Sequence, residues 1–298
     1  MRVAVIGGTG FVGRYLVETL IGQGHHVNVL VRPGSEGKLL PSGCVRKVSG
    51  DVSDVDALHH ELEGSRAVIY NVGLLREFPR RGITFEQAQY QGVVDTVAAA
   101  RDEGISRMLL MSAIGAKDPG TKYQSTKRRA EIYALESGLD VTVLRPSVIF
   151  GDPRGAMEFA TQLYREMVRP PLPAVAFPGV QLSPVHIEDV ADAFVSALTD
   201  DETIGKVIEL GGPEILSWKE IVERVAAGAG KRKLILPMPM WLMRLGATLF
   251  DWLPFYPVTR DQLTMLSEGN TAPSDALEKL LGRPARRLTA ESLEYLTQ

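Results

Sequence analysis

The stretch VAVIGGTGFVGRYLVETL, residues 3–20, decides the fold class of this chain. An apolar run opens it, glycines stand at positions 7, 8, 10 and 13, and an amphipathic helical pattern follows. The spacing fits G-x-G-x-x-G read from Gly8 and G-x-x-G-x-x-G read from Gly7. Glycines at this point allow a tight turn, and the helix N-terminus offers free N–H groups to a phosphate. The pattern predicts a dinucleotide-binding turn, and a glycine-rich turn without a ligand is the alternative.

Short β-branched runs alternate with helical patterns over the first 150 residues. The predicted strands are residues 3–6, 27–31, 45–48, 67–70, 108–111 and 141–144. Helical patterns closed by glycine lie between them, for example at 14–24 and 90–104. The strands show little polar alternation, as expected where both faces of a parallel sheet are covered. We therefore predict an α/β protein with a doubly wound parallel-sheet Rossmann fold.

The pattern changes after residue 150. Residues 151–180 contain one helical pattern and then a proline-rich loop, residues 184–199 another helix, and residues 206–212 a last strand. From Pro213 onward the chain is helical and punctuated by prolines. We expect residues 1–150 with 181–212 to form the dinucleotide-binding domain. Residues 151–180 with 213–298 would form a smaller, mainly helical C-terminal lobe for a substrate or partner.

Composition excludes several classes of function. The 298 residues carry a net charge of -3 with scattered Lys and Arg, so nucleic acid is not an expected partner. Cys44 is the only cysteine, and the five histidines lack metal-ligand spacing, so we expect no metal site. No secretory signal and no apolar run of about 18 residues occurs, which predicts a cytoplasmic protein without a transmembrane segment.

The end of the second predicted strand bears on the choice of nucleotide. An NAD site usually has an acidic residue there to bind the ribose 2′-hydroxyl. Here the strand ends on Arg32, with no carboxylate before Glu36. Arg14 stands in the first turn of a helix, where a cation opposes the helix dipole unless an anion lies beside it. A clamp of Arg14 and Arg32 on a 2′-phosphate favours NADP(H) over NAD, and two solvated arginines are the alternative.

The stretch KYQSTK, residues 122–127, contains a candidate proton-transfer pair. Tyr123 and Lys127 are four residues apart and share one face of a predicted helix. A nearby ammonium favours the phenolate and is expected to lower the pKa of the phenol. Ser112 stands at the end of a predicted strand, where a hydroxyl can orient a carbonyl oxygen. The alternative is that Tyr123 and Lys127 are ordinary helix residues.

Motifs along nearly the whole chain resemble those of extended or atypical short-chain dehydrogenases/reductases of the NAD(P)-dependent epimerase/dehydratase type. GGTGFVGR (7–14), GDVSD (50–54), YNVG (70–73) and LRPSVIFG (144–151) resemble the family's cofactor-contacting segments. GFVGRYLV, the VRP after the second strand and PVTRDQLTMLSEGN near the C-terminus are most similar to the branch containing the NADPH-binding accessory subunit of mitochondrial complex I and its bacterial relatives. The resemblance implies cofactor contacts at Gly7, Thr9, Gly10, Phe11, Val12, Gly13, Arg14, Arg32, Asp51, Val52, Asn71, Val72, Gly73, Lys127, Pro146, Ser147, Val148 and Ile149.

The resemblance implies catalytic roles for Tyr123, Lys127 and Ser112, with two departures from the family pattern. The working serine of active relatives often lies one or two positions later, where this chain has Ala113 and Ile114. Gln89 or a neighbour replaces the family's helix asparagine. Three functions remain open: an oxidoreductase acting on a carbonyl or hydroxyl of a rather apolar substrate, a non-catalytic NADPH-binding structural or assembly protein, and a nucleotide-sugar epimerase/dehydratase.

An apolar segment, residues 237–257, is the candidate surface for a larger partner. It is either a substrate-lobe helix over the cofactor cleft or a contact with a protein complex or membrane surface. The second interpretation predicts a peripheral position at the inner membrane face. The apolar composition of the lobe suggests a quinone-like or lipid-like ligand rather than a nucleotide sugar.

Overall fold

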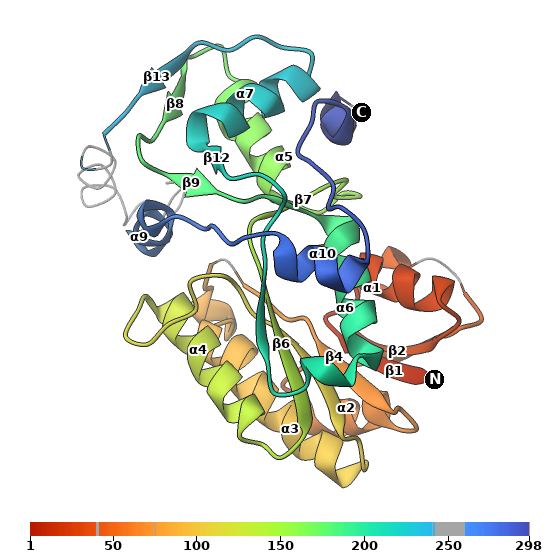
Figure 1. The fold of residues 1–298 in the computed structure, drawn as a ribbon. Coiled ribbons are helices and arrows are strands. Elements are labelled where there is room, and N and C mark those ends of the chain that lie inside the picture. Colours follow the sequence, from red (N-terminus) through yellow and green to blue (C-terminus); the bar gives the residue numbers. More distant parts are fainter. Residues whose placement is uncertain (40–41, 75, 240, 242–259, 298) are drawn as a thin grey trace. The chain divides into compact units, whose positions relative to one another are not determined.

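The computed structural model describes residues 1–39, 42–74, 76–239, 241 and 260–297 (Figure 1). Its contacts divide the chain into two units, Met1–Arg145 with Val190–Glu209 and Pro146–Asp189 with Leu210–Gln298. The expected partner segment at 237–257 lies outside the described residues, apart from 237–239 and Trp241.

The first unit is built on a seven-stranded sheet with the order β11-β6-β5-β4-β1-β2-β3. The strands are β1 (Arg2–Ile6), β2 (His26–Val31), β3 (Val45–Ser49), β4 (Ala67–Tyr70), β5 (Arg107–Met111), β6 (Asp140–Pro146) and β11 (Val207–Leu210). The pairs β1–β2, β1–β4, β2–β3, β4–β5 and β5–β6 are parallel. Each predicted strand is confirmed, and so is the doubly wound Rossmann fold. The strand order reverses between β1 and β4, and ligands of such sheets bind beyond the carboxyl ends of the strands there.

Helices cover both faces of this sheet. They are α1 (Phe11–Gly22), α2 (Val55–Leu62), α3 (Gly92–Asp102), α4 (Lys122–Leu135) and α6 (Ile187–Thr199), with short turns η1 (Glu36–Lys38), η2 (Pro79–Arg81) and η5 (Asp201–Thr203). A π-helix, η3 (Glu86–Gln91), leads into α3. Buried side chains of α2, α3 and α4 pack with sheet residues such as Ala4, Val68 and Met108. Figure 1 shows α1 against the other face.

The second unit combines short helices with two-stranded pairs. Its helices are α5 (Phe159–Leu163), η4 (Tyr164–Val168), α7 (Trp218–Gly228), α9 (Arg260–Glu268), α10 (Asp275–Leu281) and η6 (Glu291–Thr297). Its strands are β7 (Ile149–Phe150), β8 (Ala174–Ala176), β9 (Gln181–Leu182), β10 (Val185–His186), β12 (Leu216–Ser217) and β13 (Ile235–Pro237). They pair as β10–β7, β12–β9 and β13–β8. Residues 181–189, which we expected with the sheet domain, pair within this unit because β9 and β10 bond to β12 and β7.

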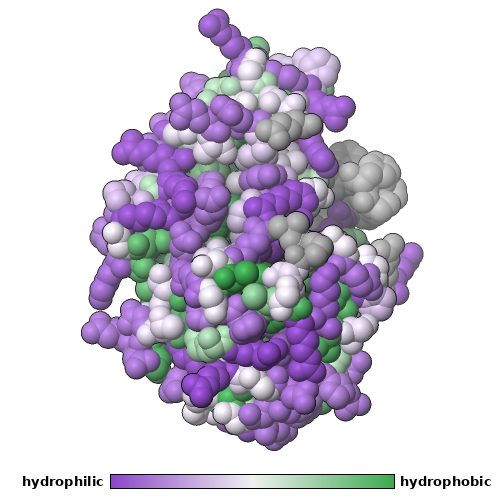
Figure 2. Space-filling view, turned by 90° about the vertical axis from the view of Figure 1, so that its right-hand side faces the viewer, coloured by the Kyte–Doolittle hydropathy of each residue, from purple (hydrophilic) through white to green (hydrophobic). Residues whose placement is uncertain are grey.

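Exposed hydrophobic side chains are few and dispersed on the face that Figure 2 shows, where hydrophilic residues predominate. Single exposed apolar residues are normal on protein surfaces and by themselves indicate no partner. Among the described residues, no helix is both long enough and apolar enough to cross a membrane.

One buried carboxyl in the first unit makes the fold sensitive to pH. Glu61 of α2 is fully buried, and its Oε1 accepts the backbone N–H of Leu30 at 3.0 Å. Oε2 is buried without a hydrogen-bond partner among the described residues. Burial raises the pKa of this carboxyl to about 8, because the apolar surroundings disfavour the charged form. The folded chain therefore holds a proton here that the unfolded chain loses near pH 4.5.

We expect Glu61→Gln to remove an alkaline loss of stability. The raised pKa contributes stability that is complete below pH 4.5 and is lost as the pH rises through about 8. The full shift corresponds to roughly 3–5 kcal/mol in the free energy of unfolding. Urea unfolding should show equal stability of variant and wild type at pH 4 and a more stable variant at pH 9. Glu63→Gln is the control, because Glu63 is exposed and Arg46 lowers its pKa. Parallel pH profiles for wild type and Glu61→Gln would show that Glu61 does not titrate in this way.

Candidate functional site

The glycine turn after β1 has the backbone geometry of a phosphate cradle. Gly7 has a φ of +86°, and a Cβ there would lie 2.5 Å from the carbonyl oxygen of Asn71. A Cβ at Gly13 would lie 2.1 Å from the carbonyl oxygen of Gly7. Gly10 precedes α1 and provides no side-chain cap, so the first N–H groups of the helix are left for a ligand. The turn therefore needs glycine at both positions and fits a pyrophosphate.

Other predicted cofactor residues lie on the strand ends beside this turn. Asn71, Val72 and Gly73 directly follow β4, the neighbour of β1 at the point where the strand order reverses. The backbone of this segment approaches the glycine turn closely, since the carbonyl group of Asn71 occupies the space that a Cβ of Gly7 would need. Thr9, Phe11 and Val12 belong to the turn and the start of α1.

On the adenine side, Asp51 and Val52 follow β3. Arg32, at the end of β2, places its Nε 4.0 Å from Oδ2 of Asp51, and both side chains are substantially exposed. The side chain of Val52 lies near the start of α3, 3.0 Å from where a Cβ of Gly92 would stand. The structure thus gathers the predicted residues of the first unit around the carboxyl ends of β1, β2, β3 and β4.

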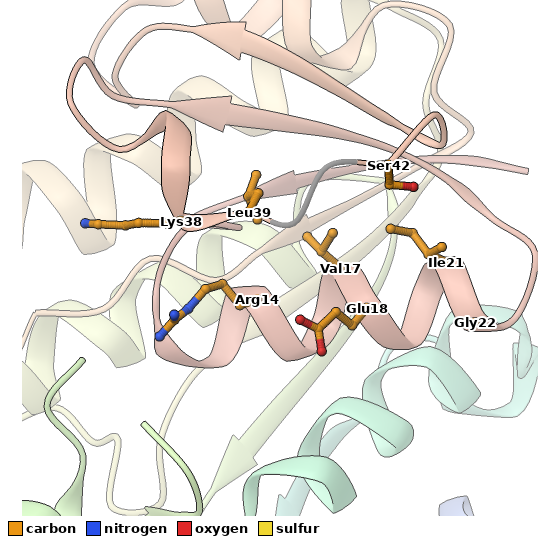
Figure 3. Close-up of a pocket in the computed structure, with 8 residues that line it drawn as sticks. All are labelled: Arg14, Val17, Glu18, Ile21, Gly22, Lys38, Leu39 and Ser42. Carbon is orange, nitrogen blue, oxygen red and sulfur yellow. The ribbon is translucent and has the colours of Figure 1, made fainter. Parts of the chain in front are cut away.

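A pocket of about 310 Å³ lies between α1 and the segment after η1 (Figure 3). Val17, Ile21 and Leu39 give it an apolar wall, and Arg14 and Lys38 extend toward the same end of it. Arg32 does not line this pocket. The cation that shares the pocket with Arg14 is therefore Lys38, which the sequence analysis missed. Lys38 is the only basic residue between Arg32 and Arg46, and this was the one feature of the sequence that could have identified it as a phosphate contact.

Helix α4 presents the candidate proton-transfer pair. Thr121 caps the helix, since its side chain accepts the backbone N–H of Gln124 at 3.3 Å and Gln124 bonds back to the N–H of Thr121 at 2.9 Å. Lys127 is 4% exposed, and its Nζ donates to the carbonyl oxygens of Met111 at 3.0 Å and Val72 at 3.3 Å. The ammonium therefore ties α4 to the end of β5 and to the loop after β4.

The electrostatics of the pair differ from our expectation. Burial raises the pKa of Tyr123 to about 12, and Lys127 does not offset this shift. Burial lowers the pKa of Lys127 to about 8, against the opposing effect of Glu131. The ammonium of Lys127 donates its hydrogen bonds to two backbone carbonyl groups. Desolvation of the phenol therefore outweighs any attraction between the phenolate and this ammonium. The phenol is therefore protonated at neutral pH, a state that donates a proton rather than accepting one.

Packing on one side fixes the ring of Tyr123. The ring of Phe85 meets it edge to face, with centroids 5.6 Å apart and planes at 80°. Among the described residues, the Tyr123 hydroxyl has no protein hydrogen-bond partner. Packing on Phe85 thus holds the ring in place.

Ser112 is less well suited to contact a substrate. It follows β5, and its N–H extends the sheet by donating to the carbonyl of Leu144 at 2.8 Å. The residue is 4% exposed, and its Oγ is buried without a hydrogen-bond partner among the described residues. The next residue, Ala113, carries no hydroxyl. In this arrangement no hydroxyl of residues 112–114 reaches solvent.

Gln89, which with its neighbours is the candidate replacement for the family's asparagine, lies in a buried hydrogen-bond network. It is 1% exposed in the π-helix η3, donates to the carbonyl of Leu74 at 3.1 Å and accepts from Thr126 Oγ1 at 3.4 Å. The amide therefore joins η3, α4 and the loop after β4. Lys127 belongs to α4 and bonds to the same loop after β4 through the carbonyl of Val72.

The remaining predicted cofactor residues, Pro146, Ser147, Val148 and Ile149, belong to the second unit. Ser147 donates its hydroxyl to the carbonyl of Asn270 at 3.0 Å and its N–H to the carbonyl of Leu210. Within its own unit, Ser147 therefore fastens the segment after β6 to the chain near Asn270.

The parallel sheet, the glycine cradle and the buried lysine define a dinucleotide-binding Rossmann protein. A family model described as NAD(P)H-binding matches residues 7–201. The chain belongs to this NAD(P)H-binding family.

Subunits of NADH dehydrogenase and a ceramide reductase resemble the chain over most of its length. It is 29% identical to NADH dehydrogenase (ubiquinone) 1 alpha subcomplex subunit 9 of Arabidopsis thaliana, covering 92% of this chain and 70% of that protein. It is 27% identical to the Mus musculus protein of the same name, over 98% of this chain and 78% of that one. A ceramide reductase of Caulobacter vibrioides is 29% identical, over 84% of this chain and 78% of the reductase.

Solved structures of epimerases share the fold. The UDP-glucose 4-epimerase of Thermus thermophilus, solved with NAD, has a TM-score of 0.71 and 21% identity over 100% of this chain and 98% of that chain. The UDP-glucuronic acid 4-epimerase of Bacillus cereus has a TM-score of 0.75 and 17% identity, with the same coverage. At these identities the likeness concerns the fold alone.

Proposed function

We propose that this protein is an NADPH-dependent reductase that converts a carbonyl group of an apolar substrate into an alcohol. Bound NADPH would supply the hydride for the carbonyl carbon. Tyr123 would donate the proton that the carbonyl oxygen takes up, and solvent would return that proton to Tyr123. The observation that carries the proposal is the ring-packed phenol of Tyr123 on the same helix as the buried ammonium of Lys127. A phenol that carries its proton at neutral pH is in the state that a proton donor to a carbonyl oxygen requires.

The preference for NADPH over NADH rests on charge near the second strand. No carboxylate stands between the end of β2 and Glu36, so an acceptor for a ribose 2′-hydroxyl is missing from this stretch. Arg14 and Lys38 extend toward one end of the pocket beside α1. Two cations at that position suit a phosphate better than a neutral hydroxyl.

The apolar nature of the substrate is supported by the relative named as a ceramide reductase and by the composition of the C-terminal part. A nucleotide-sugar epimerase is less well supported, because its likeness extends only to the fold.

A second candidate function is a nucleotide-holding subunit of a protein complex. The buried and unbonded Oγ of Ser112 favours it, because a carbonyl reductase of this kind would use a second hydroxyl on the substrate oxygen. The relatives named as subunits of NADH dehydrogenase also favour it. Bound NADPH would then stabilise the fold by mass action without turnover.

Purification with its bound nucleotide separates the two candidates. We expect NADPH to accompany the protein, to exchange with added nucleotide, and to be oxidised when apolar ketones or quinones are supplied. Mass spectrometry identifies the nucleotide, and absorbance at the reduced nicotinamide band follows oxidation. NADPH that remains bound and inert against the whole panel would favour the subunit. Copurified NAD(H) would contradict the NADPH preference.

A further inference from the structure

The loop between β4 and η3 folds back on itself as a short hairpin, which we call the 76–84 hairpin. The N–H of Phe78 donates to the carbonyl of Ile83 at 2.7 Å, and the N–H of Ile83 donates back at 3.3 Å. A 3-10 turn, Pro79–Arg81, forms the tip, and Gly82 closes it with a φ of 70° in the left-handed region. Glycine adopts this conformation at no steric cost, which allows the chain to reverse tightly after the tip.

The hairpin is a local concentration of positive charge in an acidic chain. Arg76 and Arg80 are exposed and have no hydrogen-bond or carboxylate partner among the described residues. The only acidic residue of the hairpin, Glu77, is turned inward, because its Oε1 accepts the N–H of Phe85 at 2.9 Å. Lys122 stands 3.9 Å from Glu77 with 79% of its side chain exposed. The chain as a whole has a net charge of -3, so an anionic surface would be attracted to this hairpin and repelled by the net charge of the protein.

An exposed aromatic ring lies among these cations. Phe78 is 47% exposed and stands between Arg76 and Arg80 in the sequence. A phenyl group enters the boundary between lipid head groups and acyl chains, while guanidinium groups bind lipid phosphates. An exposed ring flanked by basic side chains matches a bilayer that contains anionic lipids. A protein partner would instead bind the ring in a pocket shaped to fit it, so it matches this combination less well.

The 76–84 hairpin is attached directly to the candidate site. Phe85, whose N–H bonds to Glu77, packs against the ring of Tyr123. Lys122, the neighbour of Tyr123 at the start of α4, pairs with the same glutamate. The base of the hairpin at Glu77 is therefore linked to Tyr123 within the first unit, through Phe85.

We propose that the 76–84 hairpin docks this protein on an anionic phospholipid surface, with Phe78 inserted and Arg76 and Arg80 on lipid phosphates. Docking brings Tyr123 to the bilayer, where an apolar substrate resides. Only this consequence rests on the proposed reductase function; the docking itself does not.

Cosedimentation of the full chain with vesicles tests the docking. We expect the protein to bind vesicles of phosphatidylcholine with phosphatidylglycerol, to ignore vesicles of phosphatidylcholine alone, and to be released by salt. Arg76→Gln/Arg80→Gln should weaken binding about thirtyfold, because each basic residue contributes roughly fivefold at such a surface. Phe78→Ser should weaken binding without changing its salt dependence. NADPH binding by each variant, measured separately, should be unchanged.

Arg66→Gln/Lys206→Gln is the matched control. Both residues are exposed and precede strands β4 and β11, at the amino end of the sheet opposite the candidate site. The control removes the same charge and should keep wild-type binding to vesicles. Equal losses in the control and the hairpin variant, or no binding by the wild type, would overturn the proposal. Loss of turnover with a soluble anionic substrate in the hairpin variant, without any vesicle binding, would assign the arginines to that substrate instead.

Discussion

Replacing Tyr123 with phenylalanine is expected to lower kcat for carbonyl reduction by about 10²–10⁴-fold, the usual contribution of a positioned general acid. Phenylalanine preserves the ring that packs edge to face on Phe85, so the local structure should be retained. In the proposed function, backbone groups of the glycine turn and Lys127 would hold the nucleotide, so the Kd for NADPH should not change. Single-turnover oxidation of bound NADPH measures the loss directly.

Tyr133→Phe provides a control on the same helix. Tyr133 packs edge to face on Tyr90 with centroids 6.2 Å apart, and it lies ten positions from Tyr123. Removing its hydroxyl should leave both kcat and NADPH affinity at wild-type values. Turnover that survives in Tyr123→Phe would remove Tyr123 from the mechanism and direct attention to another proton donor.

The sequence was sufficient for the parts of the site that local patterns determine. The glycine spacing before α1 requires the turn that is found, because a Cβ at Gly7 or Gly13 would collide with backbone atoms. The order of strands follows from short connections and right-handed crossovers, which leave few topologies for alternating strands and helices. Thr121 with Gln124 is a capping pair, a local pattern that starts α4 at Lys122 and places Tyr123 in its first turn.

Other parts depend on contacts between distant segments and were not predictable. Lys38 reaches the pocket because the chain after β2 returns over α1, and no periodicity of the sequence encodes that return. The π-helix before α3 interrupts the 3.6-residue period that identifies helices. The four-residue spacing predicts that Tyr123 and Lys127 share one helix face. It does not predict their burial, which raises the pKa of Tyr123 and lowers the pKa of Lys127. The position of Ser112 at a strand end follows from the local sequence pattern. Its burial depends on packing against distant segments, which that pattern does not determine.

Arg14→Gln/Lys38→Gln is expected to weaken NADPH binding about 100-fold and to leave NADH binding unchanged. Each hydrogen bond from a cation to a phosphate contributes roughly 1.5–3 kcal/mol, and losing both costs at least two powers of ten in Kd. Titration of the purified variant with each nucleotide, followed by reduced-nicotinamide fluorescence, gives the two Kd values. An equal loss for both nucleotides would show that the two cations contact some other part of the cofactor.

The Tm of the Arg14→Gln/Lys38→Gln variant shows whether weaker NADPH binding comes from unfolding. An Arg32→Gln variant tests the clamp of Arg14 and Arg32 that the sequence suggested. Arg14 stands in the first turn of α1, where the helix dipole opposes a cation by about 0.3–1 kcal/mol, so the dipole alone predicts no loss of stability on its removal. A weaker NADPH complex with an unchanged Tm therefore indicates a lost phosphate contact. Arg32 is the comparison, because its side chain is 62% exposed and lies 4.0 Å from Asp51. Arg32→Gln should cost less than Arg14→Gln/Lys38→Gln, since Asp51 competes with a phosphate for the guanidinium. If Arg32→Gln alone abolished the preference for NADPH, the phosphate would lie at the end of β2 and the pocket beside α1 would not hold it.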